Sequence, residues 1–184
     1  MKKLLAILML ACLLTPAYAE LPDGLEMNPE GWFWTGVVEG GFSFLLPDDT
    51  YSWELTEVEQ AAGIMLVAGN DDFTIQVRRF EPEQLTLDRM AEMLENEPTA
   101  DTEKLDMDGT TVIRYRNTGA SATSELYGIV FNGADGRLYK INFFTGVDED
   151  FSAEAPVWEI AAFIADSLMP MDFSDWPIEE GAAA

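Results

Sequence analysis

Histidine is absent from the 184-residue chain, and cysteine occurs once, at Cys12. Without an imidazole the protein has no Ser-His-Asp triad and lacks the most common zinc ligand. A single cysteine cannot form a disulfide within the chain. We therefore expect no catalytic residues, no metal and no cofactor, and we interpret the protein as non-enzymatic.

Basic residues are also scarce, because 10 Lys and Arg face 34 Asp and Glu and leave a formal net charge of −24. Such a charge repels nucleic acids and anionic lipids. We therefore exclude nucleic acid as a partner. The length favours one domain, and the apolar content of 48% is enough for one core of ordinary size.

The one long apolar run, over residues 4–14, is too short to span a membrane comfortably. It follows Lys2 and Lys3, and Ala17-Tyr18-Ala19 supplies a small-x-small cleavage site before Glu20. We predict a secretory signal peptide over residues 1–19 and a mature protein without a membrane anchor, in the extracellular space or the periplasm. The alternative is a lipoprotein signal acylated at Cys12, which Met9 at the first position of the box disfavours.

Residues 20–40 are rich in Gly and Pro and show no sustained periodicity, so we interpret them as an N-terminal arm or linker. Its Trp32-Phe33-Trp34 cluster is too apolar to remain in water. The interpretation we favour is therefore that they fold back onto the domain, and the alternative is that Trp32, Phe33 and Trp34 are candidates for contact with a partner. We place a single domain at residues 41–169 and an acidic tail at 170–184.

Within that domain, apolar alternation and turn residues predict strands, and two segments have helical spacing. The predicted strands are 42–46, 63–68, 73–80, 104–107, 110–117, 124–131 and 137–145, and the predicted helices are 86–96 and 155–168. Hairpin signals between successive strands favour an antiparallel order. The fold class is therefore α+β, with one antiparallel sheet of about five to seven strands flanked by helices.

Every basic residue beyond the signal peptide falls between Arg78 and Lys140. Alternation places Ile113 and Tyr115 on a core face with the apolar positions of the next two strands, Tyr127, Ile129, Phe131, Tyr139, Ile141 and Phe143. The opposite face would then gather an anion-binding candidate made of Arg78, Arg114, Arg116 and Lys140. The interpretation we favour is that these cations pair with the protein's own acids, such as Glu125.

Pairs of carboxylates are common in so acidic a chain. Asp71-Asp72, the Asp106/Asp108 pair and residues 148–150 could offer oxygen ligands to calcium, but none has the ligand spacing of a dedicated loop. We interpret each as a turn or loop.

Two short patterns indicate a family. Phe42-Ser43-Phe44-Leu45-Leu46-Pro47 followed by Trp53 resembles the opening of PsbP-like and DcrB-like domains, and Ile164-Ala165-Asp166-Ser167-Leu168 resembles the end of their closing helix. The resemblance covers residues 41–169. It implies an αβα sandwich around an antiparallel sheet, and a secreted or lumenal accessory protein without shared catalytic residues.

These observations together predict a secreted, non-enzymatic binding or accessory domain that acts as a monomer. Its partner would be another protein or a component of the cell envelope. The alternative is a carboxylate-dependent hydrolase or a calcium-dependent sugar-binding module. A deep pocket that holds two acids with raised pKa values would favour the alternative.

Overall fold

The structure is a computed structural model that describes residues 30–107, 109–118, 125–145, 156–171 and 173. It contains a seven-stranded sheet in the order β3-β4-β5-β9-β8-β7-β6 and a three-stranded sheet in the order β1-β2-β10. The large sheet comprises β3 (Tyr51–Ser52), β4 (Ile64–Gly69), β5 (Phe73–Phe80), β6 (Ala100–Met107), β7 (Thr110–Asn117), β8 (Glu125–Asn132) and β9 (Leu138–Thr145). The small sheet comprises β1 (Trp32–Val37), β2 (Phe42–Pro47) and β10 (Met169–Pro170). Neighbouring strands are antiparallel in both sheets.

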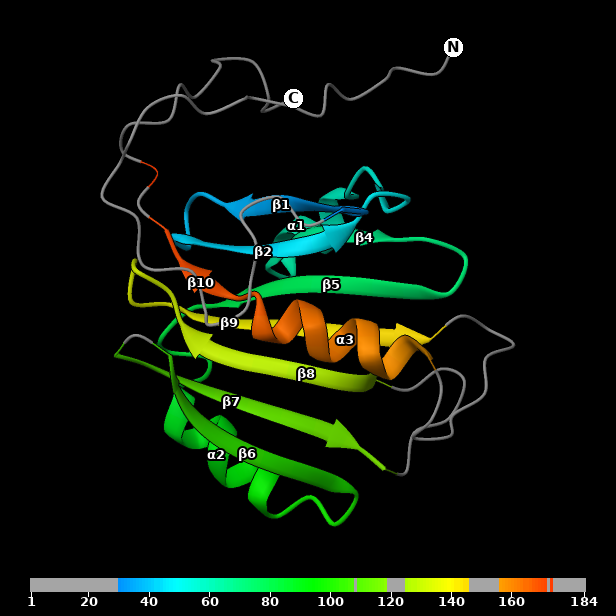
Figure 1. The fold of residues 1–184 in the computed structure, drawn as a ribbon. Coiled ribbons are helices and arrows are strands. Elements are labelled where there is room, and N and C mark those ends of the chain that lie inside the picture. Colours follow the sequence, from blue (N-terminus) through cyan, green and yellow to red (C-terminus); the bar gives the residue numbers. More distant parts are fainter. Residues whose placement is uncertain (1–29, 108, 119–124, 146–155, 172, 174–184) are drawn as a thin grey trace.

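Three helices complete the fold, namely α1 (Glu57–Ala61), α2 (Leu87–Glu95) and α3 (Pro156–Asp166). The small sheet and α3 pack on one face of the large sheet, and α2 packs on the other face near β6 (Figure 1). This arrangement confirms the predicted α+β class, the antiparallel sheet and the two predicted helices. The strand predicted at 104–107 is longer and begins at Ala100.

The main core lies between the two sheets and α3. Phe42, Phe44 and Leu46 point inward from β2, and Ile164 and Leu168 close the core from α3 and its end. From the large sheet come Phe73, Ile75, Val77, Val112, Leu126, Tyr127, Ile129, Phe131, Tyr139, Ile141 and Phe143. Such continuous apolar burial is the main source of stability in a chain without disulfides.

A second, smaller core lies on the opposite face, under α2. Met90 and Leu94 of the helix pack on Ile113, Tyr115 and Val130 of the sheet. The helix begins at Thr86, whose side chain accepts a hydrogen bond from the backbone N–H of Arg89 at 3.3 Å. A cap of this kind satisfies one of the donors that a helix start leaves free.

The segment interpreted as an arm is part of the folded unit, which corrects the boundary at residue 41. Strand β1 pairs with β2 along its whole length, from Trp32 opposite Pro47 to Val37 opposite Phe42. At the other end, β10 pairs with β2 through Met169 and Pro170, so the unit also continues past residue 169. The segment predicted to be a signal peptide and most of the predicted tail lie outside the described residues.

The short helix α1 was not among the helices predicted from the sequence. A capping box forms it, in which Thr56 accepts a hydrogen bond from the N–H of Glu59 while the Glu59 carboxylate accepts one from the N–H of Thr56. Hydrogen bonds from the Thr56 side chain and backbone hold the pKa of Glu59 below its ordinary value. Among the described helices, none combines the length and the apolar character that crossing a membrane requires.

Candidate functional site

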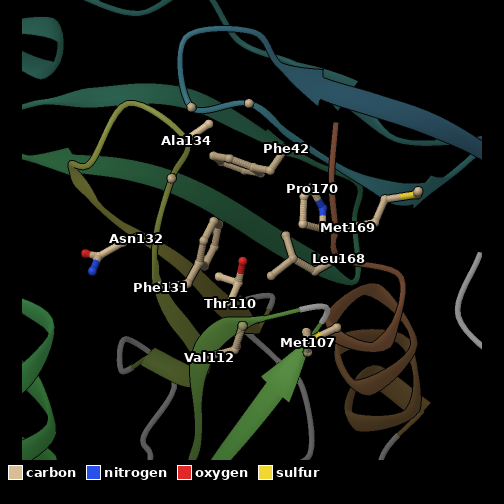
Figure 2. Close-up of a pocket in the computed structure, with 13 residues that line it drawn as sticks. Phe42, Met107, Thr110, Val112, Phe131, Asn132, Ala134, Leu168, Met169 and Pro170 are labelled. Carbon is tan, nitrogen blue, oxygen red and sulfur yellow. The ribbon is translucent and has the colours of Figure 1, made fainter. Parts of the chain in front are cut away.

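An apolar pocket of about 150 Å³ lies at the end of the domain where three hairpin turns meet β10 (Figure 2). Its walls come from the β1–β2 turn, the β6–β7 turn, the β8–β9 turn and the end of α3. The lining residues are Gly40, Gly41, Phe42, Met107, Thr110, Val112, Phe131, Asn132, Gly133, Ala134, Leu168, Met169 and Pro170. None of these described residues is ionisable, and most of the described lining is apolar.

Backbone contacts fix the shape of this pocket. The N–H of Ala134 donates to the carbonyl of Gly40 at 2.8 Å, and the N–H of Met171 donates to the carbonyl of Gly41 at 2.9 Å. Gly41 has a φ of +65°, and a Cβ there would lie 2.6 Å from the Cβ of Ala134. The turn therefore requires glycine both for its conformation and for the close approach of the two turns.

A network of charged and polar side chains joins the β1–β2 and β8–β9 turns to the end of β5. Its members are Glu39, Arg79, Glu81, Arg137, Asp135 and Tyr139. Arg137 bridges Glu81 at 2.9 Å and Asp135 at 3.1 Å. Burial works to raise the pKa of Asp135, but hydrogen bonds from Arg137 and Tyr139 outweigh it and the pKa is lowered. Burial and the bond to Asp135 raise the pKa of Tyr139.

The four predicted anion-binding residues do not share one face, which corrects the register inferred from alternation. Cross-strand partners in an antiparallel sheet point to the same side. Arg114 of β7 lies opposite Ile129 of β8. Its neighbour Ile113 lies opposite Val130, which in turn lies opposite Lys140 of β9. Arg114 and Arg116 are therefore on the α3 side. Lys140 and its partner Arg78 are on the α2 side, together with Ile113 and Tyr115.

On the α3 side, the two arginines line an open groove of about 360 Å³. Arg114 pairs with Asp166 of α3 and with Glu103 of β6, the latter at 2.8 Å. Arg116 approaches Asp101 at 3.7 Å, and its guanidinium lies 5.6 Å from the ring centre of Trp158. Burial opposes the charge of Arg114, but its hydrogen bond to Glu103 and the nearby acids raise its pKa.

On the α2 side, Lys140 pairs with Glu125 at 3.1 Å and lies 5.4 Å from the ring centre of Tyr115. Burial raises the pKa of Glu125, and the charge of Lys140 offsets part of this effect. Arg78 donates from Nε to the carbonyl of Ala62 at 3.0 Å and lies over the ring of Phe80. Three of the four predicted cations thus contact acids of the same chain, as the favoured interpretation expected.

The three aromatic residues predicted to contact a partner are packed into the domain as part of β1. Trp32 lies 4.3 Å, between ring centres, from Phe163 of α3. Trp32 and Phe33 both pack against the main core. Trp34, opposite Leu45, is half-buried. Their arrangement agrees with the favoured interpretation that this segment folds back onto the domain.

Sequence reasoning did not find the apolar pocket. Its lining comes from turns that are far apart in the chain, and several of the residues are glycines or core residues by pattern. The one local signal is the recurrence of small residues at the tips of two hairpins, Gly40-Gly41 and Gly133-Ala134. Small residues at such tips permit two turns to approach closely.

Comparison with solved structures gives a likeness in fold. The solution structure of cyanobacterial PsbP (CyanoP) from Synechocystis sp. PCC 6803 matches with a TM-score of 0.52 at 13% identity, over 78% of this chain and 95% of that chain. A crystal structure from Bacteroides thetaiotaomicron VPI-5482 matches with a TM-score of 0.39 at 14% identity, over 74% of this chain and 47% of that chain. No protein-family model matches the chain, and no curated protein matches it. The likeness to CyanoP confirms the PsbP-like fold expected from the sequence.

Proposed function

We propose that the protein is a secreted, non-enzymatic accessory domain that binds another protein or an envelope component as a monomer. In this proposal the apolar pocket receives one side chain of the partner. The domain works outside the cytoplasm, in the periplasm or the extracellular space, and needs neither metal nor cofactor. The signal-like segment at residues 1–19 supports the location, and the PsbP-like fold is compatible with an accessory role.

The size and lining of the pocket carry the proposal. A cavity of about 150 Å³ lined by apolar side chains is large enough for one benzene ring, whereas sites for small molecules and cofactors are commonly about 300–1,000 Å³. The volume here therefore suits a single aromatic or branched side chain. Insertion of one such anchor into a desolvated pocket is a frequent source of affinity between proteins.

The environment of Glu125, the described acid whose pKa is raised, supports the non-enzymatic part of the proposal. A hydrolase that uses two acids needs two carboxyl groups on opposite sides of one substrate site. Burial raises the pKa of Glu125, but the group that faces its carboxylate is the ammonium of Lys140. Glu125 therefore forms an ion pair with Lys140, which favours a structural role for this carboxylate.

The test compares partner capture by two threonine variants. Thr110 lines the pocket, and its neighbour Thr111 points to the other face of β7. The immobilised wild-type chain, Thr110→Phe and Thr111→Phe would each be exposed to the exported proteins of the native source, with retained proteins identified by mass spectrometry. We expect Thr110→Phe to fill the pocket and lose a protein that the wild type and Thr111→Phe both retain. Equal retention by all three chains would refute the role of the pocket.

A further inference from the structure

A pair of aromatic rings is exposed at one edge of the large sheet, where Tyr51 belongs to the edge strand β3 and Trp53 follows that strand directly. Tyr51 is 50% exposed and Trp53 is 40% exposed. Their ring centres are 4.7 Å apart, with the planes inclined at 61°. Val58 of α1, close by in the chain, is 78% exposed. Three of the five large apolar side chains that are exposed among the described residues therefore fall between residues 51 and 58.

The chain segments around this pair are acidic, and the nearest cation on the same side of the sheet is Arg78, which follows Gln76 on β5 and donates to the carbonyl of Ala62. Residues 30–77 contain nine Asp and Glu and no Lys or Arg. Asp48 and Asp49 lead into β3, and residues 70–72 form the adjacent β4–β5 turn, which a hydrogen bond of 3.1 Å from Asn70 to Asp49 joins to the first turn. Acids thus border the aromatic pair at one end of the strand.

Acids also follow the pair at the other end, where Glu54 and Glu57 are exposed. The rings themselves share one side of the strand, because residues two apart on a strand point the same way. That side also carries Thr74 and Gln76, which lie across β4 from Tyr51 and Trp53 in the sheet. The surface therefore combines open aromatic faces, neutral polar groups and flanking carboxylates.

This combination is complementary to lysine and arginine side chains. The face of an aromatic ring attracts a cation, most strongly for tryptophan. Surrounding carboxylates add a field that gathers cations and repels anions. We propose that Tyr51, Trp53 and the acids that flank β3 form a docking surface for a lysine- and arginine-bearing segment of a partner protein. This surface lies on different elements from the apolar pocket, so either proposal can fail without the other.

Titration with a capped octapeptide of alternating lysine and arginine, followed by NMR of the tryptophan indole N–H groups, tests the proposal on the full chain. Trp53→Phe identifies the Trp53 signal. We expect this signal to shift with peptide and the binding to weaken as salt is added, because exposed charges are screened. Trp53→Ala, which leaves the charge unchanged, should weaken binding about two- to fivefold.

Matched charge variants separate this surface from the attraction of an acidic protein for any polycation. Glu54→Gln with Asp71→Asn removes two charges beside the rings, and Glu83→Gln with Glu95→Gln removes two exposed charges elsewhere. The first pair should weaken binding more than the second. Equal effects of the two pairs, or unchanged binding by Trp53→Ala with its fold intact by circular dichroism, would overturn the proposal. A shift of the Trp53 signal by a neutral oligosaccharide but not by the peptide would overturn it in favour of a sugar ligand.

Discussion

The replacement of Gly128 by alanine tests the packing of the second core, because the ring of Tyr115 lies directly on this glycine. The two residues are cross-strand partners on β8 and β7. An added Cβ would lie 2.2 Å from Cζ, 2.3 Å from Oη and 2.4 Å from Cε1 of the tyrosine. Gly128 is not one of the positive-φ glycines, so alanine is compatible with its backbone. The cost of the change is therefore steric.

Its size follows from two opposing effects. Tyr115 is 5% exposed and packs in the core under α2, so the ring must shift within a filled space, which costs about 1–3 kcal/mol. Alanine also reduces the conformational entropy of the unfolded chain, which stabilises the folded state by about 0.4–1 kcal/mol. We expect Gly128→Ala to lower the free energy of unfolding by about 1–2 kcal/mol, or the Tm by about 2–8 °C.

Urea denaturation followed by circular dichroism measures this difference, and a double-mutant cycle assigns it. Tyr115→Leu removes the ring, so Gly128→Ala should cost at least about 1 kcal/mol less in that background. Gly136→Ala is the control, because Gly136 has a φ of +77° and an added Cβ there would meet nothing within 4 Å, so its cost should not depend on Tyr115. Full stability of Gly128→Ala, or an unchanged cost in the Tyr115→Leu background, would refute the steric reasoning.

Three further predictions concern the chain ends, one hydrogen bond and one acid. Mass spectrometry of the exported protein should find Glu20 as its first residue, and a lipidated cysteine there would contradict the signal assignment. The buried Ser167 hydroxyl accepts a hydrogen bond from the N–H of Leu45 at 2.8 Å, and Ser167→Ala leaves that donor unpaired. The free energy of unfolding, measured by urea denaturation, should therefore fall by about 1–3 kcal/mol. An unchanged free energy of unfolding would show that another acceptor replaces the hydroxyl. Because hydrogen bonds lower the pKa of Asp135, its carboxylate stabilises the fold above about pH 4 and this contribution is lost as acid protonates it. Asp135→Asn should therefore reduce the free energy of unfolding more at about pH 7 than at about pH 3, and an equal reduction at both would exclude the carboxylate as the cause.

The sequence predicted the positions of the helices and strands better than the side of the sheet to which each side chain points. Turn residues and helical spacing located the hairpins, α2 and α3. The prediction of which side chains of β7 share a face was wrong, because Val112 and Ile113 are both buried, each 1% exposed. Val112 lies under the small sheet and α3, whereas Ile113 lies under α2. A central strand that is covered on both faces has no polar side to reveal its register.

The candidate site was harder to predict for a related reason. To predict the pocket, one must know how close the turns of different hairpins lie to one another, and no local sequence pattern contains this information. The capping pattern Thr56-x-x-Glu59 was a usable signal for α1, but a helix of five residues has too little periodicity to confirm it. Pairing of the cations with acids could be expected from the excess of acids alone, whereas the particular partners depend on register.

Strand β2 is the common neighbour of the first and last described strands, and this has a consequence for the order of folding. The pairs that join β10 to β2 connect residues more than 120 positions apart, as does the hydrogen bond between Leu45 and Ser167. A chain made from its N-terminus therefore cannot complete the small sheet until β10 has emerged. Such late, long-range closure slows folding, and it leaves the inner face of β2 uncovered by α3 throughout most of synthesis.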